Sequence, residues 1–287
     1  MRDHLIEEGS LMLLKGGFTV KRITGCFDVI ARKGIQVFLA KFLEDANSIA
    51  EDAASEMRKI SSFLGASTLI IAEKVGSRLE DNIVYTRFGI QTISLETLRQ
   101  CIARHNPIAR STKAGISALV NGEKLREARA ELGYSLAELS GILRVSRSMI
   151  ARYEKDFSEI SISRAMKLYD LFGEKVFDSV DVLGTHHSPV SNPASNISRK
   201  YVALGFSAAD TRKAPFDIIA KKGNEIILTE VGDVVSEQLQ ELTKLLDAEE
   251  LIIFRRKKPK NLPALTTDEF FEFGSSEELI KFVKEFS

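Results

Sequence analysis

The sequence predicts a multidomain protein that combines α/β and all-α parts, with a small helical domain between two α/β domains. The chain has 287 residues, which is enough for two or three domains. Residues 122–173 hold four short amphipathic helical patterns. The segments on either side of them resemble each other, which indicates an internal repeat. We therefore expect domains at about residues 1–107, 116–180 and 197–287.

The first α/β domain is indicated by a short motif and by the elements after it. FDVIARKG at residues 27–34 precedes an apolar strand at 37–40. A helix and a buried strand at 69–71 follow, and a Phe-Gly step at 88–89 leads to a helix capped by Ser94. The apolar stripe of the first of these helices consists of Ile49, Ala53, Ile60 and Leu64.

The second α/β domain repeats this order of helix, strands, helix, strand and helix. FDIIAKKG at residues 216–223 matches the first motif at almost every position, and an apolar strand at 226–229 follows it. A helix, a buried strand at 251–253, a Phe-Gly step at 273–274 and a capped helix from Ser276 complete the copy. The helical stripe here consists of Val235, Leu239, Leu242 and Leu246.

The first two helices of the central domain have clear end signals. The first runs from Glu123 to about Leu132, and Gly133 ends it because glycine tolerates the left-handed conformation. Ser135 caps the second helix, and Glu138 three residues later completes a capping box. The expected inward residues of the two helices are Leu125, Ala128, Leu132, Leu136, Leu139 and Leu143.

The next two helices follow a turn at Val145. Ser146 caps the third helix, and Ser161 or Ser163 caps the fourth. The spacing of the second and third helices is that of a helix-turn-helix, whose second helix fits the major groove of DNA. The expected inward residues are Met149 or Ile150 and Tyr153 in the third helix, and Ala165, Leu168, Tyr169 and Phe172 in the fourth.

This segment resembles the Cro/lambda-repressor class of helix-turn-helix domains, which have four or five helices. The resemblance implies that Arg147, Ser148 and Arg152 face the DNA groove. It also implies that the helix ends at Ser135 and Ser146 approach the DNA, with the Ser135 end facing a phosphate. These five residues are the predicted DNA-binding residues.

Two positions depart from that class, and the charge of the segment is nearly balanced. Leu136 stands where a glutamine is usual, and Asp156 where a glycine is usual. Residues 121–173 contain nine Lys or Arg and eight Asp or Glu, whereas a strong non-specific DNA binder would carry a clear basic excess. An interaction module that no longer touches DNA is the alternative reading of this domain.

Composition and end sequences narrow the class of protein. Lys and Arg together number 40, as do Asp and Glu, so the net charge is zero and favours no electrostatic membrane attachment. Cys26 and Cys101 give neither a disulfide framework nor a metal quartet, which favours two buried or partly buried thiols. No signal peptide or membrane span is evident, so we expect a cytoplasmic protein. His186 and His187 lie in a Pro-rich linker without a third ligand, so we predict no metal site there.

Both α/β copies resemble the restriction-endonuclease-like fold, whose active members hold a divalent metal with an Asp followed by an Asp/Glu-x-Lys group. The first copy has Asp28 and Lys41 but Leu39 at the second acidic position. The second copy has Asp217 at the first position. Leu228 stands at its second acidic position, and Glu230 stands at its lysine position. Because leucine cannot ligate Mg²⁺, we predict that both copies are inactive, with no catalytic residue, metal or cofactor.

In the absence of a metal, Asp28 and Asp217 are expected to cap turns or to pair with Lys33 or Lys222. The densest basic run, at residues 255–260, follows a strand and could bind phosphate or form a solvated loop.

The order of domains as a whole resembles a family of archaeal helix-turn-helix transcriptional regulators. The resemblance implies a sequence-specific regulator that binds double-stranded DNA, with the operator and any effector ligand left open. The alternatives are a metal-dependent structure-specific or repair nuclease targeted by the helical domain, and a protein-interaction scaffold.

A homodimer is expected, since two-fold dimers match palindromic operators. Its candidate surfaces are the edge strands of the α/β copies and their terminal helices near Leu95, Leu98, Phe282 and Phe286. The two copies could instead pair within one chain and form an internal pseudo-dimer.

Overall fold

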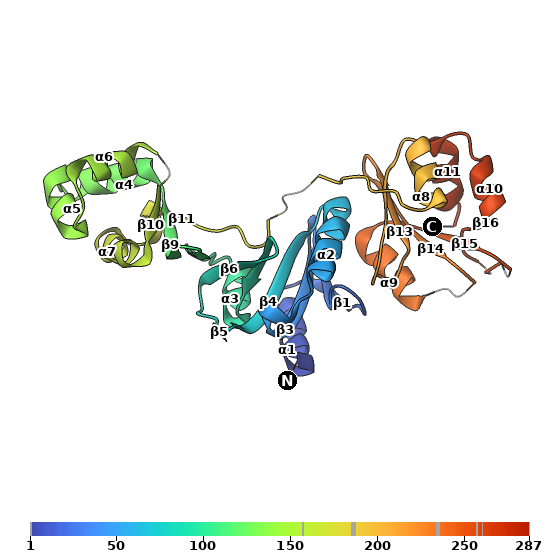
Figure 1. The fold of residues 1–287 in the computed structure, drawn as a ribbon, viewed down its shortest axis with the longest axis horizontal. Helices are drawn as coiled ribbons and strands as arrows, with labels where there is room; N and C mark the ends of the chain where they lie inside the picture. Colours follow the sequence, from blue (N-terminus) through green and yellow to red (C-terminus); the bar gives the residue numbers. More distant parts are fainter. Residues whose placement is uncertain are drawn as a thin grey trace. The chain divides into compact units, whose positions relative to one another are not determined.

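The structure is a computed structural model that describes residues 2–156, 158–184, 188–233, 236–256, 258–259 and 261–286. It contains two compact units. One consists of residues 1–70 and 183–287, and the other of residues 71–182 (Figure 1). The strand β4, Ser67–Val75, passes from the first unit into the second.

The first α/β copy forms a sheet whose strand order is β1-β2-β3-β4. Its neighbouring strands β1, β2 and β3 are antiparallel, as expected for strands joined by short turns. The helix after β3 has an acidic first turn and ends at Gly65, which adopts the left-handed conformation with φ 62°. The elements are α1 Arg2–Lys15, β1 Thr19–Arg22, β2 Val29–Lys33, β3 Gln36–Asp45, the 3-10 turn η1 Ala46–Ser48, and α2 Glu51–Leu64.

The second α/β copy forms a five-stranded sheet in the order β12-β13-β14-β15-β16. The strands β14 and β15 are parallel, because the helix α9 connects them across one face. The elements are α8 Asn196–Ala203, β12 Ser207–Asp210, β13 Ile218–Lys222, β14 Glu225–Val231, α9 Glu237–Leu246, β15 Glu249–Phe254, β16 Ala264–Thr266, α10 Thr267–Glu272 and α11 Ser276–Lys284.

The predicted repeat is present at the level of hydrogen bonds and register. In the first copy Asp28 N donates to Ala40 O at 2.9 Å, and in the second copy Asp217 N donates to Thr229 O at 2.8 Å. Each Asp therefore begins a hairpin of the same register. The helical stripes were predicted less well, since Ala54 and Met57 are fully buried in α2. In α9 the buried residues are Leu239, Leu242, Thr243 and Leu245, and Val235 lies outside the described residues.

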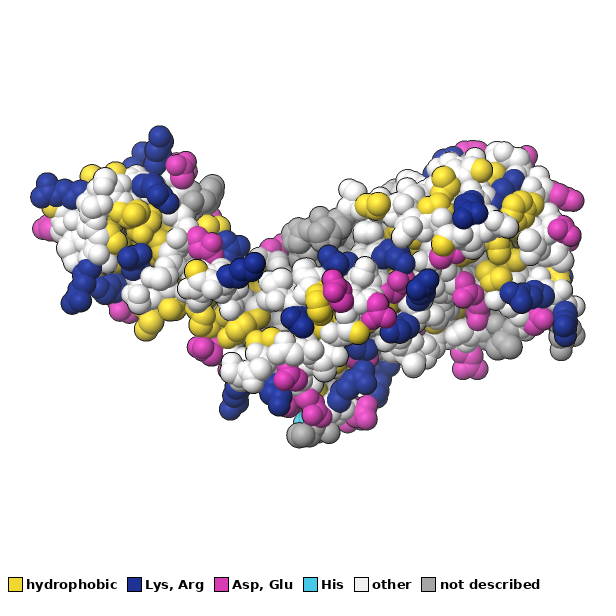
Figure 2. Space-filling view, viewed as in Figure 1, with side chains coloured by type: hydrophobic (Ala, Val, Ile, Leu, Met, Phe, Trp, Pro, Cys, Tyr) yellow, Lys and Arg dark blue, Asp and Glu magenta, His cyan; other side chains and the backbone are white. Residues whose placement is uncertain are grey.

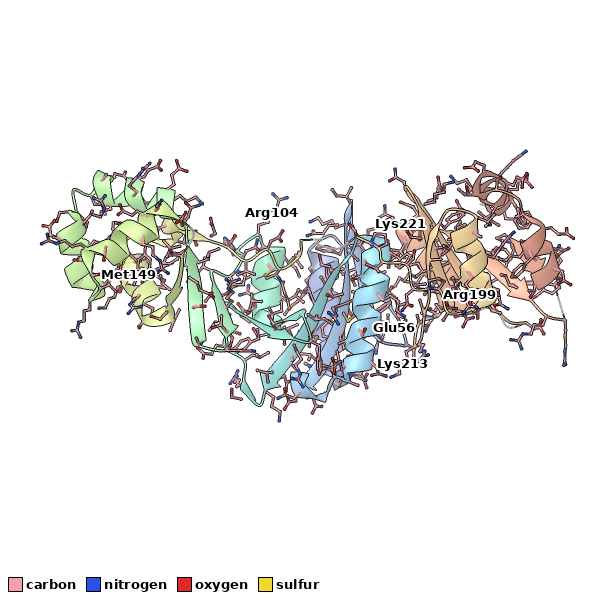
Figure 3. The ribbon with its side chains drawn as sticks, turned by 45° about the horizontal axis from the view of Figure 1, so that its top comes forward. Glu56, Arg104, Met149, Arg199, Lys213 and Lys221 are labelled. Carbon is pink, nitrogen blue, oxygen red and sulfur yellow. The ribbon has the colours of Figure 1, made fainter. Side chains whose placement is uncertain are left out.

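The two copies contact each other through equivalent atoms. Arg32 in the first motif donates to Leu245 O, near the end of α9, at 2.7 Å. The equivalent residue of the second motif, Lys221, donates to Phe63 O, near the end of α2, at 2.8 Å (Figure 3). In each case a side chain of the motif in one copy bonds the end of the helix in the other copy. Such reciprocal contacts are those of a two-fold symmetric dimer.

A second pair of contacts obeys the same relation. Thr24 N, in the loop after β1, donates to Gln238 Oε1 of α9 at 3.4 Å. Arg212 N, in the loop after β12, donates to Glu56 Oε1 of α2 at 2.8 Å. The structure therefore pairs the two copies within one chain, which was one of the two arrangements that the sequence left open.

The second unit combines the end of the first sheet with the helical domain. Its strands follow the order β4-β7-β6-β8-β9-β10, with β5 beside β4 and β11 beside β9. The strands are β5 Ser77–Arg78, β6 Ile83–Arg87, β7 Ile90–Ile93, β8 Ala109–Thr112, β9 Gly115–Val120, β10 Ser158–Ser161 and β11 Phe177–Asp178. The helices are α3 Leu95–Ile102, α4 Gly122–Glu131, α5 Leu136–Leu143, α6 Arg147–Lys155 and α7 Ile162–Phe172, followed by the 3-10 turn η2 Glu174–Val176.

The helix-turn-helix prediction is confirmed, and the strand β9 that precedes it was not foreseen. β9 pairs with β10, which follows α6, and with β11, which follows α7. Among the described residues, no helix is both long and apolar enough to cross a membrane.

Candidate nucleic-acid interface

The four helices α4 to α7 share one apolar core, which fixes the orientation of α6. Leu125, Leu139, Ile150 and Leu168 contribute one fully buried side chain from each helix. Tyr153, one turn after Ile150, is also buried. The opposite face of α6 must therefore point away from this core.

Two residues expected in this core lie outside it. Leu132 is 54% exposed because the helix α4 has already ended at Glu131 and Leu132 is its C-cap. Tyr169 is 50% exposed, since its neighbours Leu168 and Phe172 supply the buried face of α7.

The predicted caps of the two central helices are present. Ser135 and Glu138 form the expected capping box, with Glu138 N donating to Ser135 Oγ at 3.2 Å and Ser135 N donating to Glu138 Oε2 at 2.8 Å. The bonds from Ser135 lower the pKa of Glu138. Ser146 Oγ accepts a bond from Met149 N at 3.2 Å at the start of α6. Ser161 is the N-cap of α7, but its side chain makes no cap bond.

The outward face of α6 presents the predicted polar residues. Arg147, Ser148 and Arg152 are all exposed. The hydroxyl groups of Ser146 and Ser148 lie 2.8 Å apart, so Ser148 is held at the start of the helix. Figure 2 shows several Lys and Arg side chains projecting from the surface of this domain.

A buried ion pair, which no pattern in the sequence predicts, fixes α6 against α4. Arg129 Nη2 donates to Glu154 Oε2 at 3.0 Å, and Arg129 Nη1 donates to Tyr134 O at 2.7 Å. The side chain of Glu154 is 8% exposed and that of Arg129 is 16% exposed. The bonds from Glu154 raise the pKa of Arg129. Glu154 belongs to the class pattern at the end of α6, but its spacing from Arg129 carries no local signal of a contact.

A close backbone approach joins the start of α4 to the end of α6. A Cβ atom on Gly122 would lie 2.5 Å from Tyr153 O, which no ordinary contact allows. Gly122 is therefore required by packing, whereas its backbone needs no left-handed conformation.

The structure also accounts for the two departures from the class pattern. Leu136, at the usual glutamine position, is partly buried against the helical core. Asp156, at the usual glycine position, is the C-cap of α6 and has an extended backbone with φ −134°. Because this conformation is open to any residue, glycine is not needed at residue 156.

In the first α/β copy, two cationic side chains surround Asp28, which the resemblance to nucleases places at the first metal-ligand position. Arg2 Nη2 donates to Asp28 Oδ1 at 2.5 Å, and Lys41 Nζ donates to the same oxygen at 2.9 Å. Phe42 N donates to Asp28 Oδ2 at 2.9 Å. Leu39, at the second acidic position, is completely buried. A single carboxylate that already has three donors is a poor ligand set for Mg²⁺.

The second copy has a different polar arrangement at the equivalent position. Asp217 Oδ2 accepts a bond from Val231 N at 2.7 Å, and Glu230 Oε2 accepts one from Ser236 N at 2.9 Å. Burial is the main cause of the raised pKa of Glu230, and the charge of Asp217 adds to it. Leu228 is fully buried. Within the described parts of the chain, no group of three or more His, Cys, Asp and Glu side chains could hold a metal ion.

Asp28 and Asp217 were expected to cap turns or to pair with Lys33 or Lys222, and neither pairs with those two lysines. Each carboxylate instead accepts a backbone N–H bond from the strand that follows, from Phe42 and Val231 respectively. Lys33 donates to Gly16 O at 2.7 Å, and Lys222 donates to Glu277 Oε1 at 2.9 Å. The physical reason is the alternation of side chains along a strand, which carries these lysines beyond reach of the hairpin start. The histidine pair 186–187 lies outside the described residues, as do Lys257 and Lys260 of the basic run.

Comparisons with known protein families identify two regions of the chain. Residues 2–108 match the model of the PD-(D/E)XK superfamily domain, and residues 125–177 match that of a helix-turn-helix. No solved structure matches the chain.

Similar proteins from archaea carry the provisional name of HTH-type transcriptional regulatory protein. One from Pyrococcus furiosus is 28% identical, over 96% of this chain and 95% of that protein. One from Methanocaldococcus jannaschii is 29% identical, over 99% of this chain and 97% of that protein. One from Archaeoglobus fulgidus is 29% identical, over 98% of this chain and 97% of that protein. The chain thus carries a PD-(D/E)XK superfamily domain and a helix-turn-helix domain, and along its whole length it is similar to archaeal proteins named as HTH-type transcriptional regulators.

Proposed function

We propose that the protein is a sequence-specific transcriptional regulator that reads duplex DNA with the helix α6. The observation that carries the proposal is the exposed face of Arg147, Ser148 and Arg152 on a helix whose orientation is fixed by Ile150 and the buried Glu154. Arginine on such a face can bond the edge of a guanine, whereas serine can bond either a base or a phosphate.

Contacts at the helix starts complete the proposed interface. The N-termini of α5 and α6, capped by Ser135 and Ser146, carry partial positive charge and free backbone N–H groups. They are suited to phosphate contacts that set the register of α6 on the duplex.

We further propose that neither α/β copy cleaves nucleic acid. The pairing of Asp28 with both Arg2 and Lys41 supports this, together with the buried Leu39 and Leu228. The equivalent hairpins and the equivalent contacts support descent of both copies from one restriction-endonuclease-like domain, with the second copy retained for the internal pairing.

The experiment that tests the function is sequence-selective binding of the whole chain to DNA. Bound sites are mapped across the genome, and the most frequent sequence is then titrated beside a scrambled duplex at several salt concentrations. Tighter binding to the mapped sequence supports a regulator. Equal, salt-dependent affinity for both duplexes would contradict sequence-specific reading, and no binding to either would favour the interaction scaffold.

A further inference from the structure

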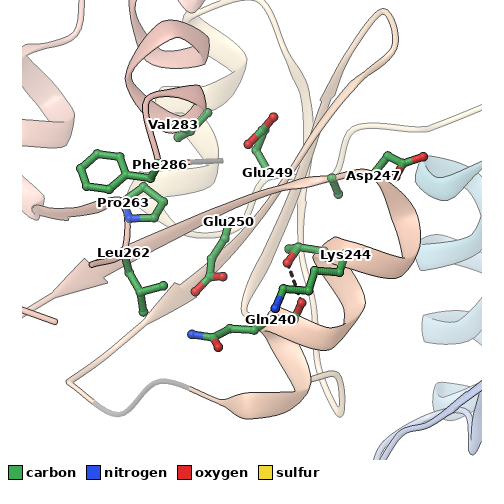
Figure 4. A pocket seen from close by; sticks show the side chains of 11 residues that line it. Gln240, Lys244, Asp247, Glu249, Glu250, Leu262, Pro263, Val283 and Phe286 are labelled. Carbon is green, nitrogen blue, oxygen red and sulfur yellow. Dashed lines mark hydrogen bonds between the residues drawn. The ribbon is translucent and has the colours of Figure 1, made fainter. Parts of the chain in front are cut away.

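A cavity in the second α/β copy lies outside the predicted DNA contacts, and Asp247 of its lining also takes part in the internal pairing through Arg32. Its volume is about 470 Å³, which lies within the range of small-molecule sites. The helix α9 and the start of β15 form one side, and the segment before β16 and the end of α11 form the other (Figure 4). The residues that line it and matter here are Gln240, Lys244, Glu250, Leu262, Val283 and Phe286.

One wall of the cavity carries an acceptor that lacks a donor. Glu250 Oε1 is sealed from solvent and has no hydrogen-bond partner among the described residues. Burial, and then the charge of Glu230, raise the pKa of Glu250 above its ordinary value. A buried acceptor without a partner is unfavourable, so a ligand that brings a donor to this carboxylate would be stabilised by it.

The opposite wall is apolar. Leu262, Pro263 and Val283 line it, and Phe286 stands beside them with 47% of its surface exposed. Figure 4 shows the Glu250 carboxylate turned toward Gln240 and Leu262, so the acidic and apolar walls face the same space. A few placed polar groups against an apolar wall are the usual composition of a small-molecule site.

The charge of the cavity favours a cation. Asp247, Glu249 and Glu250 line it together with one basic residue, Lys244. Asp247 is already paired with Arg32 at 2.5 Å, which leaves Glu250 as the carboxylate that faces the interior with an unmet acceptor.

The fold itself does not require an acid at this position. In the first copy the strand β4 has Thr68 where β15 has Glu250, each directly before the matching Leu-Ile-Ile run. An acid with a raised pKa has therefore been placed on a strand that folds without one in the other copy.

We propose that this cavity binds a small molecule that carries a protonated amine and an apolar group. The amine pairs with the carboxylate of Glu250, and the apolar group contacts Leu262 and Phe286. Such a site goes beyond DNA reading by α6, because all of its residues lie in the second copy.

Calorimetry on the full chain tests the site with phenethylamine and, as a probe of similar size and opposite charge, 3-phenylpropionate. We expect the amine to bind and the carboxylate not to bind. Glu250→Gln removes the charge-assisted bond with little change of shape, so it should weaken amine binding by about tenfold or more. The control is Glu272→Gln, an exposed carboxylate of the same copy outside the cavity, which should leave the affinity unchanged.

Phe286→Ala provides a second measurement that does not depend on the folding of the Glu250 variant. It should weaken the binding of phenethylamine, and methylamine, which lacks the apolar group, should bind less tightly than phenethylamine to the unmodified chain. The proposal is overturned if the unmodified chain binds neither probe, if it prefers the carboxylate, or if Phe286→Ala and a folded Glu250→Gln both keep full affinity.

Discussion

Lys41 and Glu230 occupy the same strand position in the two α/β copies and have opposite effects on the local charge. Lys41 donates to Asp28, which also receives a bond from Arg2, so the carboxylate is neutralised. Glu230 instead places a second acid near Asp217, and its pKa is raised. At the scale of the residue, the two hairpins have the same backbone structure but different side-chain chemistry. Neither has an acid at the second acidic position of a metal-dependent nuclease, where Leu39 and Leu228 stand instead.

Incubation with Mg²⁺ or Mn²⁺ should therefore give no cleavage of duplex, branched or single-stranded DNA. The physical reason is the ligand set, because Leu39 and Leu228 cannot coordinate a cation. Gel electrophoresis of end-labelled substrates checks this. Cleavage that disappears in Asp28→Ala would establish the enzyme instead.

The outward residues of α6 should contribute to DNA affinity without contributing to folding. We expect Arg147→Ala or Arg152→Ala to lower the affinity for the specific site by about 1–3 kcal/mol if the arginine reads a guanine edge. A phosphate contact would instead reduce the salt slope by about one unit for all sequences. Ser148→Ala should have a smaller effect in the same direction, because it removes a single neutral hydrogen bond.

Fluorescence anisotropy with labelled duplex measures these affinities. The matched control is Lys175→Ala, an exposed cation of the same domain that lies outside α6 and pairs with Glu131. If all three variants bind DNA as tightly as the unmodified chain, the outward residues of α6 do not contact DNA.

The two thiols should be unreactive in the native chain. Burial is the main cause of the raised pKa of about 12 for both Cys26 and Cys101. At pH 8 the thiolate fraction is therefore very small in the folded protein, and it rises on unfolding because the ordinary pKa of the thiol is 9.0. Mass spectrometry after iodoacetamide treatment should show labelling in denaturant and almost none without it. Rapid labelling of the native chain would contradict the burial of these side chains.

At the scale of the element, the orientation of α6 depends on its junction with α4. Gly122 lets the backbones approach closely, and the Arg129–Glu154 pair closes the other side of the contact. A buried pair of this kind fixes an arrangement more reliably than it adds stability. The recognition face is thus set by residues that lie on the inner side of the domain.

Gly122→Ala should destabilise the helical domain by about 1–3 kcal/mol, because its Cβ would overlap backbone atoms that cannot move aside. Gly141→Ala, in the middle of α5, is the matched control. Nothing lies within 4 Å of its added Cβ, so the higher helix propensity of alanine should leave stability equal or raise it by about 1 kcal/mol. Chemical denaturation followed by circular dichroism measures the free energy of unfolding of the two variants. Equal stability of both would show that the backbone of α6 does not closely approach residue 122.

At the scale of the whole molecule, the two α/β copies pair with each other within one chain. Arg32 and Lys221 make the same contact in opposite directions, so the surface that would join two separate α/β domains is used inside one chain. Leu98, one of the residues expected near a dimer surface, is fully buried, whereas Phe286 is exposed. The homodimer stays a prediction, and two chains on a palindromic operator would need a surface outside the reciprocal contact.

Light scattering on Arg32→Ala/Lys221→Ala tests this assignment. We expect the double variant to keep the mass of the unmodified chain, whether one chain of 31.9 kDa or two, because the lost bonds are intramolecular. Its thermal midpoint should fall, because Arg32 loses its bonds to Leu245 O, Gly34 O and Asp247 and Lys221 loses its bond to Phe63 O. A hydrogen bond made by a charged group is worth roughly 1.5–3 kcal/mol. A dimer that becomes a monomer in the double variant would show that these contacts join separate chains.

The sequence by itself determined the features that depend on neighbouring residues. The capping box of Ser135 and Glu138, the N-cap at Ser146 and the buried stripe of Ile150 and Tyr153 follow from patterns within a few positions. The repeat was equally visible, because FDVIARKG and FDIIAKKG encode the same hairpin start. The exposure of Arg147 and Arg152 follows from the same periodicity.

Only the tertiary structure decided the contacts between residues that are distant in the chain. The pairing of Arg129 with Glu154, of Asp28 with Arg2, and of Lys221 with Phe63 joins positions that no local pattern relates. The short strands β9 and β10 were missed for the same reason, since each is stabilised by its partner rather than by its own sequence. Local periodicity sets which face of an element is apolar, but the choice of what that face meets depends on the packing of the whole chain.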